Sequence, residues 1–244
     1  MGRISETIKA LIIVNVIFYI GTIALGETSY RLFSLFYFEN PNFQVWQPLT
    51  HMFMHGGIMH IVFNMYALWA FGSPLEQNWG RNKFLFFYFS AGFGAALIHT
   101  LVNYYQVSSA ADILLNAGMT QAEITNLLTT GQYNSGILNS VNIETIQSAY
   151  NSFNTPAVGA SGAIYGILVA FGLMYPNAEL MLIFLPIPIK AKYFIPLILL
   201  GDLFFGISGA GTGVAHFAHI GGALFGFIMA YYWKKNSFNS RRWN

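Results

Sequence analysis

Cysteine is absent from this 244-residue chain, and charged residues make up only 8% of it. The absence of cysteine excludes disulfides, thiolate metal sites and a cysteine nucleophile. Soluble domains carry about 25% charged residues, so this chain has too few charges to cover a water-facing surface. Its net charge of +2 is too small to favour nucleic acid as a partner. Because 55% of the residues are hydrophobic, we expect a single membrane domain over residues 1–244.

Six apolar runs approach the roughly 20 residues that a membrane-spanning helix needs. They cover about 10–25, 58–72, 84–101, 157–175, 193–207 and 214–233. The pattern therefore predicts an all-α bundle of six membrane helices. No clean cleavage site follows the first run, so we interpret it as an uncleaved span and not as a signal peptide.

The positions of lysine and arginine predict the orientation of these spans. If there are six spans, ten of the eleven basic residues fall on one side, and Arg31 alone falls on the other. Both termini are then expected in the cytoplasm. The ten residues are Arg3, Lys9, Arg81, Lys83, Lys190, Lys192, Lys234, Lys235, Arg241 and Arg242.

Two sizeable segments are expected on the outer side. Residues 26–57 are rich in aromatic side chains and suit a segment lying in the membrane interface. Residues 103–156 contain no lysine or arginine, and their apolar residues at helical spacing predict short amphipathic helices between flexible turns. This insertion carries no catalytic signature and is interpreted as a solvated outer loop.

Polar groups inside membrane spans are costly and tend to mark functional sites. His60 and Asn64 lie four residues apart and share a helix face, as do Ser161 and Tyr165. Taken singly, such a residue is more often a buried group that a neighbouring helix satisfies. Several spans that present such groups together favour chemistry. The full set is His60, Asn64, Ser161, Tyr165, Asp202, His216 and His219.

Glycines accompany these groups at four-residue spacing, which lets membrane helices approach closely. A serine hydroxyl and a histidine nitrogen need such an approach to exchange a proton at about 3 Å. The pattern predicts Ser161 as a nucleophile and a histidine of the last span as its base. His219 is preferred over His216 because it leads directly into the second glycine pair. The glycines are Gly162, Gly166, Gly222 and Gly226.

With these residues in place, the chain resembles the rhomboid intramembrane serine proteases. The resemblance covers about residues 45–102 and 157–230, and three motifs carry it in the family's order. They are Gly159-Ala160-Ser161-Gly162, Ala218-His219 with Gly222 and Gly226, and His60 with Asn64 inside residues 55–64.

The resemblance implies a role for each matching residue. Ser161 would be the nucleophile and His219 its general base, in a dyad with no carboxylate third member. Asn64 and His60 would help the Ser161 amide hold the oxyanion, and the Tyr165 ring would stack on the catalytic imidazole. The supporting glycines would be Gly159, Gly162, Gly222 and Gly226.

Other positions are assigned structural roles. Asp202 matches a position outside the dyad, and His51 and His55 match loop positions that are structural in the family. The family's outer loop commonly reads Trp-Arg, whereas Trp46 is followed here by Gln47. Glutamine has fewer donors and no charge, so this departure puts the rigidity of the loop in question.

The implied function is an intramembrane serine endopeptidase of the inner cell membrane. It would cleave membrane-spanning segments of other proteins near the outer face of the bilayer, with no cofactor, metal or nucleic acid. The alternative is a catalytically inactive relative that binds and escorts membrane helices, although such proteins typically lack the serine or the histidine.

Two further classes are less favoured. A metalloenzyme or haem protein would use His51, His55, His60, His216 and His219. The chain has no His-Glu-x-x-His motif, however, and carboxylates near these histidines are lacking. A transporter would be supported by inverted repeats, and no internal repeat is evident.

Overall fold

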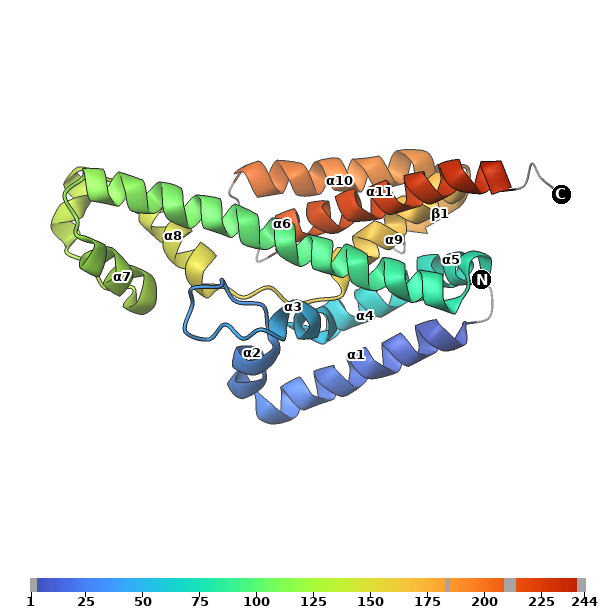
Figure 1. Cartoon of the computed structure of the whole chain (residues 1–244), viewed down its shortest axis with the longest axis horizontal. Helices are drawn as coiled ribbons and strands as arrows, with labels where there is room; N and C mark the ends of the chain where they lie inside the picture. The colour runs from blue at the N-terminus through green and yellow to red at the C-terminus, as the bar shows by residue number, and fades with distance from the viewer. Residues whose placement is uncertain (1–3, 183–184, 209–213, 241–244) are drawn as a thin grey trace.

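The computed structural model describes residues 4–182, 185–208 and 214–240, and this part of the chain is mostly helical (Figure 1). The longer helices are α1 (Glu6–Leu25), α4 (Ile58–Ala67), α6 (Arg81–Asn116), α9 (Ser161–Met174), α10 (Ala191–Ser208) and α11 (His216–Ser240). The π-helical turn η2 (Leu68–Gly72) joins α4 to α5 (Ser73–Trp79), so residues 58–79 form one continuous rod.

Four of these rods are long and apolar enough to cross a membrane: α1, residues 58–79, α6 and α10. The 14-residue α9 is apolar but shorter than the usual requirement of about 20 residues. Two histidines and several glycines in the first part of α11 lower its hydropathy. Large aliphatic side chains such as Ile17, Ile20 and Ile23 are exposed along α1, as expected for a surface that meets lipid and not water.

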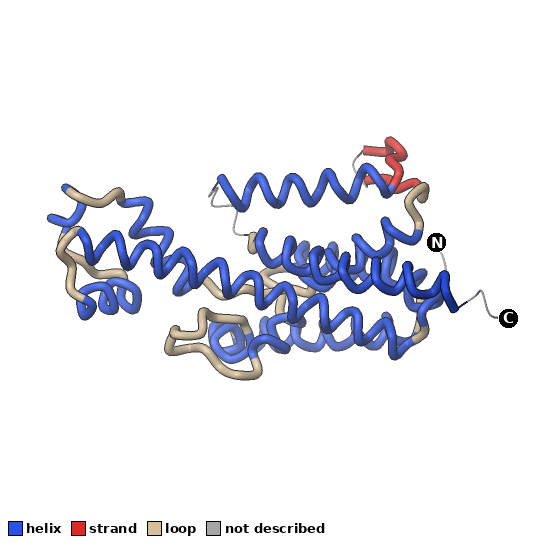
Figure 2. Tube along the Cα trace, turned by 45° about the horizontal axis from the view of Figure 1, so that its top comes forward, coloured by secondary structure: helices blue, strands red, loops and turns tan. Residues whose placement is uncertain are grey.

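The structure corrects two details of the sequence prediction. The third rod does not end near residue 101 but continues to Asn116, so the first part of the expected insertion is helix. The chain is also not purely helical. Strands β1 (Glu179–Leu182) and β2 (Leu185–Lys190) pair as an antiparallel hairpin between α9 and α10, which Figure 2 shows at one end of the bundle.

The helix ends sort into two groups. The start of α1, the turn between α5 and α6, the hairpin and the end of α11 lie at one end of the molecule (Figure 1). The basic residues Lys9, Arg81, Lys83 and Lys190 belong to these parts of the chain, whereas Arg31 belongs to α2, which follows the opposite end of α1. The remaining residues of the predicted charge pattern include Arg3, Arg241 and Arg242, which lie outside the described residues.

Helices α6, α9 and α11 form the centre of the bundle, and glycines set their separation. A Cβ atom added to Gly222 of α11 would lie 1.8 Å from the carbonyl oxygen of Gly162 in α9. One turn on, a Cβ atom on Gly226 would lie 2.4 Å from the Cα atom of Gly166. No side chain fits at these distances, so the two backbones touch directly, as the four-residue glycine spacing predicts.

The outer segments form a second, smaller core. Helices α7 (Gln121–Thr130) and α8 (Ile143–Asn154), with η3 (Ser135–Asn139) between them, fold against the outer part of α6. A capping box of Thr120 and Glu123 starts α7, and Gly131 ends it in the left-handed conformation. Leu114, Ile124 and Leu127 are fully or almost fully buried, so the amphipathic helices pack into a small subdomain. They are not a loose loop.

The segment of residues 26–57 contacts this subdomain and also forms hydrogen bonds within itself. It comprises α2 (Glu27–Phe33), a loop, α3 (Gln47–Thr50) and the 3-10 turn η1 (His51–Phe53). The Asn40 side chain donates to the carbonyl of Phe153 in α8 (2.9 Å), and Leu35 forms an isolated antiparallel bridge with Ala157. The outer segments therefore hold each other above the start of α9.

Gln47 is fully buried in this loop and uses its whole amide group. Its Nε2 donates to the carbonyls of Arg31 (3.0 Å) and Asn42 (2.8 Å), and its Oε1 accepts from the Phe36 amide (3.2 Å). The doubt about loop rigidity raised by the missing arginine is therefore unfounded, because glutamine bonds three separate points of the loop.

Replacing Gln47 with alanine should destabilise the protein by about 2–4 kcal/mol, because it leaves the buried Phe36 amide and two partly buried carbonyls without partners, at up to about 1–3 kcal/mol each. The measurement is the unfolding free energy in detergent. Gln44→Ala is the matched control, since the half-buried Gln44 side chain makes no hydrogen bond in the described structure. Equal unfolding free energies for the two variants would contradict this account of Gln47.

Candidate active site

Ser161 is the first residue of α9, and the chain that leads to it is held at two points. The Ala157–Leu35 bridge fixes one point, and the amide of Gly159 donates to the carbonyl of His51 (2.9 Å). Gly159 has φ +126°, a conformation that glycine adopts without steric penalty. The hydroxyl of Ser161 is therefore positioned at the N-terminal end of α9, beside the segment of residues 26–57.

The predicted pair of Ser161 and His219 comes together in the structure. His219 Nε2 lies 2.8 Å from Ser161 Oγ, across the glycine contact between α9 and α11. The Tyr165 ring, one turn along α9, stacks on the imidazole with ring centroids 4.1 Å apart and an interplanar angle of 13°. The Tyr165 ring therefore fixes the plane of the His219 imidazole, and one imidazole nitrogen points at the Ser161 hydroxyl. This is the arrangement that a nucleophile and its base require.

The other nitrogen of this imidazole meets a carboxylate. His219 Nδ1 lies 3.1 Å from Oδ1 of Asp202 in α10, and His216 Nδ1 lies 2.5 Å from the same oxygen. The interpretation of Asp202 from the sequence, as a structural residue outside a dyad without a carboxylate member, did not predict this contact. His216 does not reach Ser161, and its ring nitrogen bonds Asp202 instead.

His60 and Gly159 border the space beside the hydroxyl. A Cβ atom on Gly159 would lie 2.9 Å from His60 Nε2 and 3.4 Å from Ser161 Oγ, so only glycine leaves this space open. The amide of Gly56 donates to His60 Nδ1 (3.3 Å). The neutral ring then carries its proton on Nε2, which is the nitrogen that faces Gly159.

Asn64 lies one turn beyond His60 on α4 and is buried, with 6% of its surface exposed. Its Nδ2 has no hydrogen-bond partner among the residues that the structure describes. Buried donors are nearly always paired in folded proteins, and a lone one needs an explanation. Together with His60 Nε2, for which the described residues show no hydrogen bond, it gives α4 two N–H groups on one face.

The remaining predicted histidines serve the outer loop. His51 Nδ1 bonds the Gln47 carbonyl (2.9 Å), and burial lowers the pKa of His51 to about 4. Burial and the neighbouring His60 likewise lower the pKa of His55 to about 4. Both rings are thus neutral at neutral pH and act as polar packing groups near Ser161.

Two residues near the imidazole are not predicted from the sequence in this role, Asp202 and His99. His99 lies in α6, where its Nε2 bonds the Asn103 side chain one turn on (3.2 Å), and it is close enough to interact electrostatically with His51 and His219. Its four-residue spacing from Asn103 was a usable signal. For Asp202 the signal was its isolation, because a charge within an apolar run needs a partner.

Within the described residues, one group of side chains offers metal-ligand atoms close together: Asp202, His216 and His219, with ligand atoms within 4.8 Å of one another. Those atoms already bond one another. Of the five histidines considered as ligands for a metal or haem, His216 and His219 belong to this cluster, His51 and His55 to the loop before α4, and His60 to α4.

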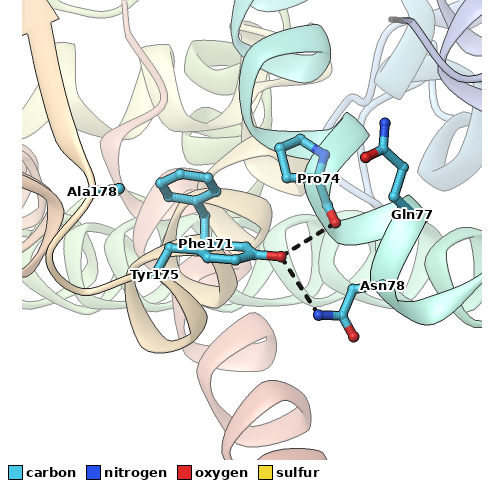
Figure 3. Close-up of a pocket in the computed structure, with 6 residues that line it drawn as sticks. All are labelled: Pro74, Gln77, Asn78, Phe171, Tyr175 and Ala178. Atoms are coloured by element: carbon cyan, nitrogen blue, oxygen red, sulfur yellow. Dashed lines mark hydrogen bonds between the residues drawn. The ribbon is translucent and has the colours of Figure 1, made fainter. Parts of the chain in front are cut away.

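A separate cavity of about 450 Å³ lies at the other end of α9 (Figure 3). Tyr175 and Phe171 line one side and Pro74 and Asn78 of α5 the other, with the Tyr175 hydroxyl 3.5 Å from the Pro74 carbonyl and from Asn78 Nδ2. Fourteen residues of mainly helical chain, about 20 Å, separate Tyr175 from Ser161. This cavity is therefore not part of the serine–histidine site.

A family model described as the Rhomboid domain matches residues 42–236, which include all the residues of this site. The chain is 24% identical over 246 residues to the rhomboid protease AarA of Providencia stuartii, covering 94% of this chain and 73% of AarA. It is 29% identical over 235 residues to the mitochondrial presenilin-associated rhomboid-like protein of Bos taurus, covering 91% of this chain and 47% of that protein.

The human presenilin-associated rhomboid-like protein is 28% identical over 241 residues, and 48% of its length is covered. The chain thus spans about half the length of these mitochondrial relatives, and most of the length of the bacterial one.

Proposed function

The chain belongs to the rhomboid family, and we propose that it is an intramembrane serine endopeptidase with Ser161 as nucleophile and His219 as base. The observation that carries the proposal is the 2.8 Å contact between His219 Nε2 and Ser161 Oγ, under the stacked ring of Tyr165. The chain is a multi-pass membrane protein with a protease among its relatives, which supports a substrate that is itself a membrane-spanning segment.

The reaction is an acyl transfer in two steps. Ser161 Oγ attacks the scissile carbonyl carbon while His219 Nε2 takes the hydroxyl proton, and the carbonyl oxygen becomes an oxyanion. The C–N bond then breaks as the imidazolium returns that proton to the leaving amine. Water, deprotonated by the same nitrogen, hydrolyses the acyl-enzyme and restores the serine.

The oxyanion would be held by Asn64 Nδ2, His60 Nε2 and the Ser161 amide. The free buried donor of Asn64 and the space kept open by Gly159 support these roles. Donors placed in advance where negative charge develops contribute about 10²–10³ in rate. The supporting glycines, Gly162, Gly222 and Gly226, would keep α9 and α11 in contact.

The proposed arrangement in the membrane has six spans. The four apolar rods would be four of these spans, and the short α9 and α11, both in the centre of the bundle, would be the other two. Both termini would be cytoplasmic and the insertion would be external, in the inner cell membrane. Ser161 at the outer end of α9 would then be reached by water from outside, which hydrolysis within a bilayer requires.

A fluorophosphonate probe tests the nucleophile directly. We expect the detergent-solubilised protein to be labelled at Ser161, and Ser161→Ala to lose both labelling and cleavage of single-span proteins. Ser73→Ala is the matched control, because Ser73 is also a buried serine in an apolar rod and its hydroxyl has no partner within the described part of the chain.

Labelling that persists in Ser161→Ala would refute the assignment. A folded wild-type protein that neither reacts with the probe nor cleaves any member of a substrate panel would instead favour an inactive rhomboid-like protein that binds and escorts membrane helices.

A further inference from the structure

We propose that Asp202 is a positioning residue for the reaction: its carboxylate holds His219 in the tautomer and orientation that present Nε2 to Ser161. This inference rests on the proposed protease function and adds a third, cross-helix member to the serine–histidine pair.

The contacts of the imidazole carry this inference. Its two nitrogens are fully used, with Nε2 at 2.8 Å from Ser161 Oγ and Nδ1 at 3.1 Å from Asp202 Oδ1. A carboxylate can only accept at this contact, so the His219 proton must be on Nδ1, and Nε2 is left with its lone pair toward the hydroxyl. Stacking on Tyr165 fixes the plane of the ring but cannot choose between its tautomers.

Asp202 is itself held in place. It is 7% exposed, and its carboxylate bonds His216 Nδ1 at 2.5 Å and interacts with the Tyr165 hydroxyl. A buried carboxylate with several donors around it keeps one position and remains available as an anion. When His219 takes the serine proton, the resulting imidazolium faces a negative charge across a short distance, which stabilises the developing ion pair.

The same three side chains do not have the geometry of an occupied metal centre. A tetrahedral Zn²⁺ at about 2.0–2.1 Å from each ligand keeps the ligand atoms about 3.3 Å apart. The contacts of Oδ1 with His216 and His219, at 2.5 Å and 3.1 Å, are instead those of hydrogen bonds.

A plainer alternative is that Asp202 only fastens α10 to α11 through His216. The two alternatives predict different effects from removing the contact of Asp202 with His219 and the contact of Asp202 with His216. The test compares two variants. Asp202→Asn is isosteric but lacks the charge, whereas His216→Gln removes the imidazole that bonds Asp202 and leaves the contact between Asp202 and His219.

The readouts are kcat and KM for a cleaved single-span protein, the rate of fluorophosphonate labelling, and the pH profile of kcat/KM. The groups near the His219 ring in the described structure are Ser161 and Tyr165 of α9, Asp202 of α10, His216 of α11, His60 of α4 and His99 of α6. His60 and His99 are unchanged in both variants, so a difference between the profiles reports on the carboxylate and its two histidines.

For Asp202→Asn we expect kcat to fall about 10³-fold or more with little change in KM, as when the orienting aspartate of a hydrolase triad is removed. The acid limb of its pH profile should move to lower pH, because the imidazolium loses an anionic neighbour. His216→Gln should lose less than about tenfold, and Asp202→Glu, which restores the charge, should exceed Asp202→Asn in activity.

Equal losses in Asp202→Asn and His216→Gln with an unmoved acid limb would overturn the inference, as would wild-type kcat in Asp202→Asn. If the Asp202 variants do not fold, the proton resonance of the wild type decides, because a strongly downfield His219 Nδ1–H signal is expected and its absence would count against the contact. Ser161→Ala distinguishes the two proposals. Retained cleavage in Ser161→Ala refutes the protease assignment. If Ser161→Ala loses cleavage and Asp202→Asn remains active, only the role of Asp202 is refuted.

Discussion

His219→Ala is expected to lose cleavage by about 10⁴-fold or more, because the Ser161 hydroxyl then has no group to take its proton. Nucleophile and base act as one unit in serine hydrolases, so removing either costs nearly as much as removing both. The measurement is the cleavage rate of a single-span protein in liposomes, normalised to the amount of folded enzyme. The labelling rate with a fluorophosphonate should fall in parallel.

His216→Ala is the matched comparison, because both histidines belong to the same helix and bond the same carboxylate oxygen. His216 lies edge-on to the His219 ring, with centroids 6.4 Å apart, and bonds Asp202 and not the serine. Its loss should therefore be the smaller by at least a hundredfold. The sequence motif and the 2.8 Å contact both favour His219 as the base. A greater loss in His216→Ala would contradict that assignment.

The serine–histidine pair could be anticipated from sequence because its determinants are local. The glycines after Ser161 and after His219 recur at one-turn spacing, so the face on which two helices approach closely can be identified in each helix separately. Asp202 could not be placed in this way. Which face of α10 meets α11 depends on how the two helices are rotated about their axes, and the glycine-rich sequence between them does not determine that rotation.

Two elements of the fold were missed for reasons of composition. The outer part of α6 contains Asn103, Gln106 and Ser108, which favour a loop, yet Asn103, Val107, Ala110 and Leu114 recur at helical spacing and are buried. In the β1–β2 hairpin, Pro186 and Pro188 lack an amide donor, which by itself disfavours a strand. A two-stranded hairpin consists of edge strands alone, where proline is tolerated.

Gly222→Ala is expected to be the most damaging single-methyl change in the bundle. Its Cβ atom would lie 1.8 Å from the Gly162 carbonyl oxygen and 3.2 Å from the Gly162 Cα atom. These are backbone atoms of α9, so a rotamer change cannot relieve the clash, and the two helices must separate by an ångström or more. Overpacking of this kind costs about 1–3 kcal/mol or more in stability.

The same separation acts on the chemistry, because Ser161 and Gly162 belong to one helix and His219 and Gly222 to the other. A misplacement of about 1 Å at reacting groups costs about 10²-fold in rate. We therefore expect Gly222→Ala to lose at least that much cleavage activity and labelling rate per folded molecule. Its unfolding midpoint should also fall.

Gly21→Ala in α1 is the matched control, since a Cβ atom there meets nothing within 4 Å. Alanine is favoured over glycine inside helices by about 1 kcal/mol, so this variant should be as active as the wild type and slightly more stable. Wild-type labelling in Gly222→Ala would show that the glycine contact does not set the distance between the hydroxyl and the imidazole. A loss of stability alone, with the rate per folded molecule unchanged, would restrict the role of the glycine to holding the bundle together.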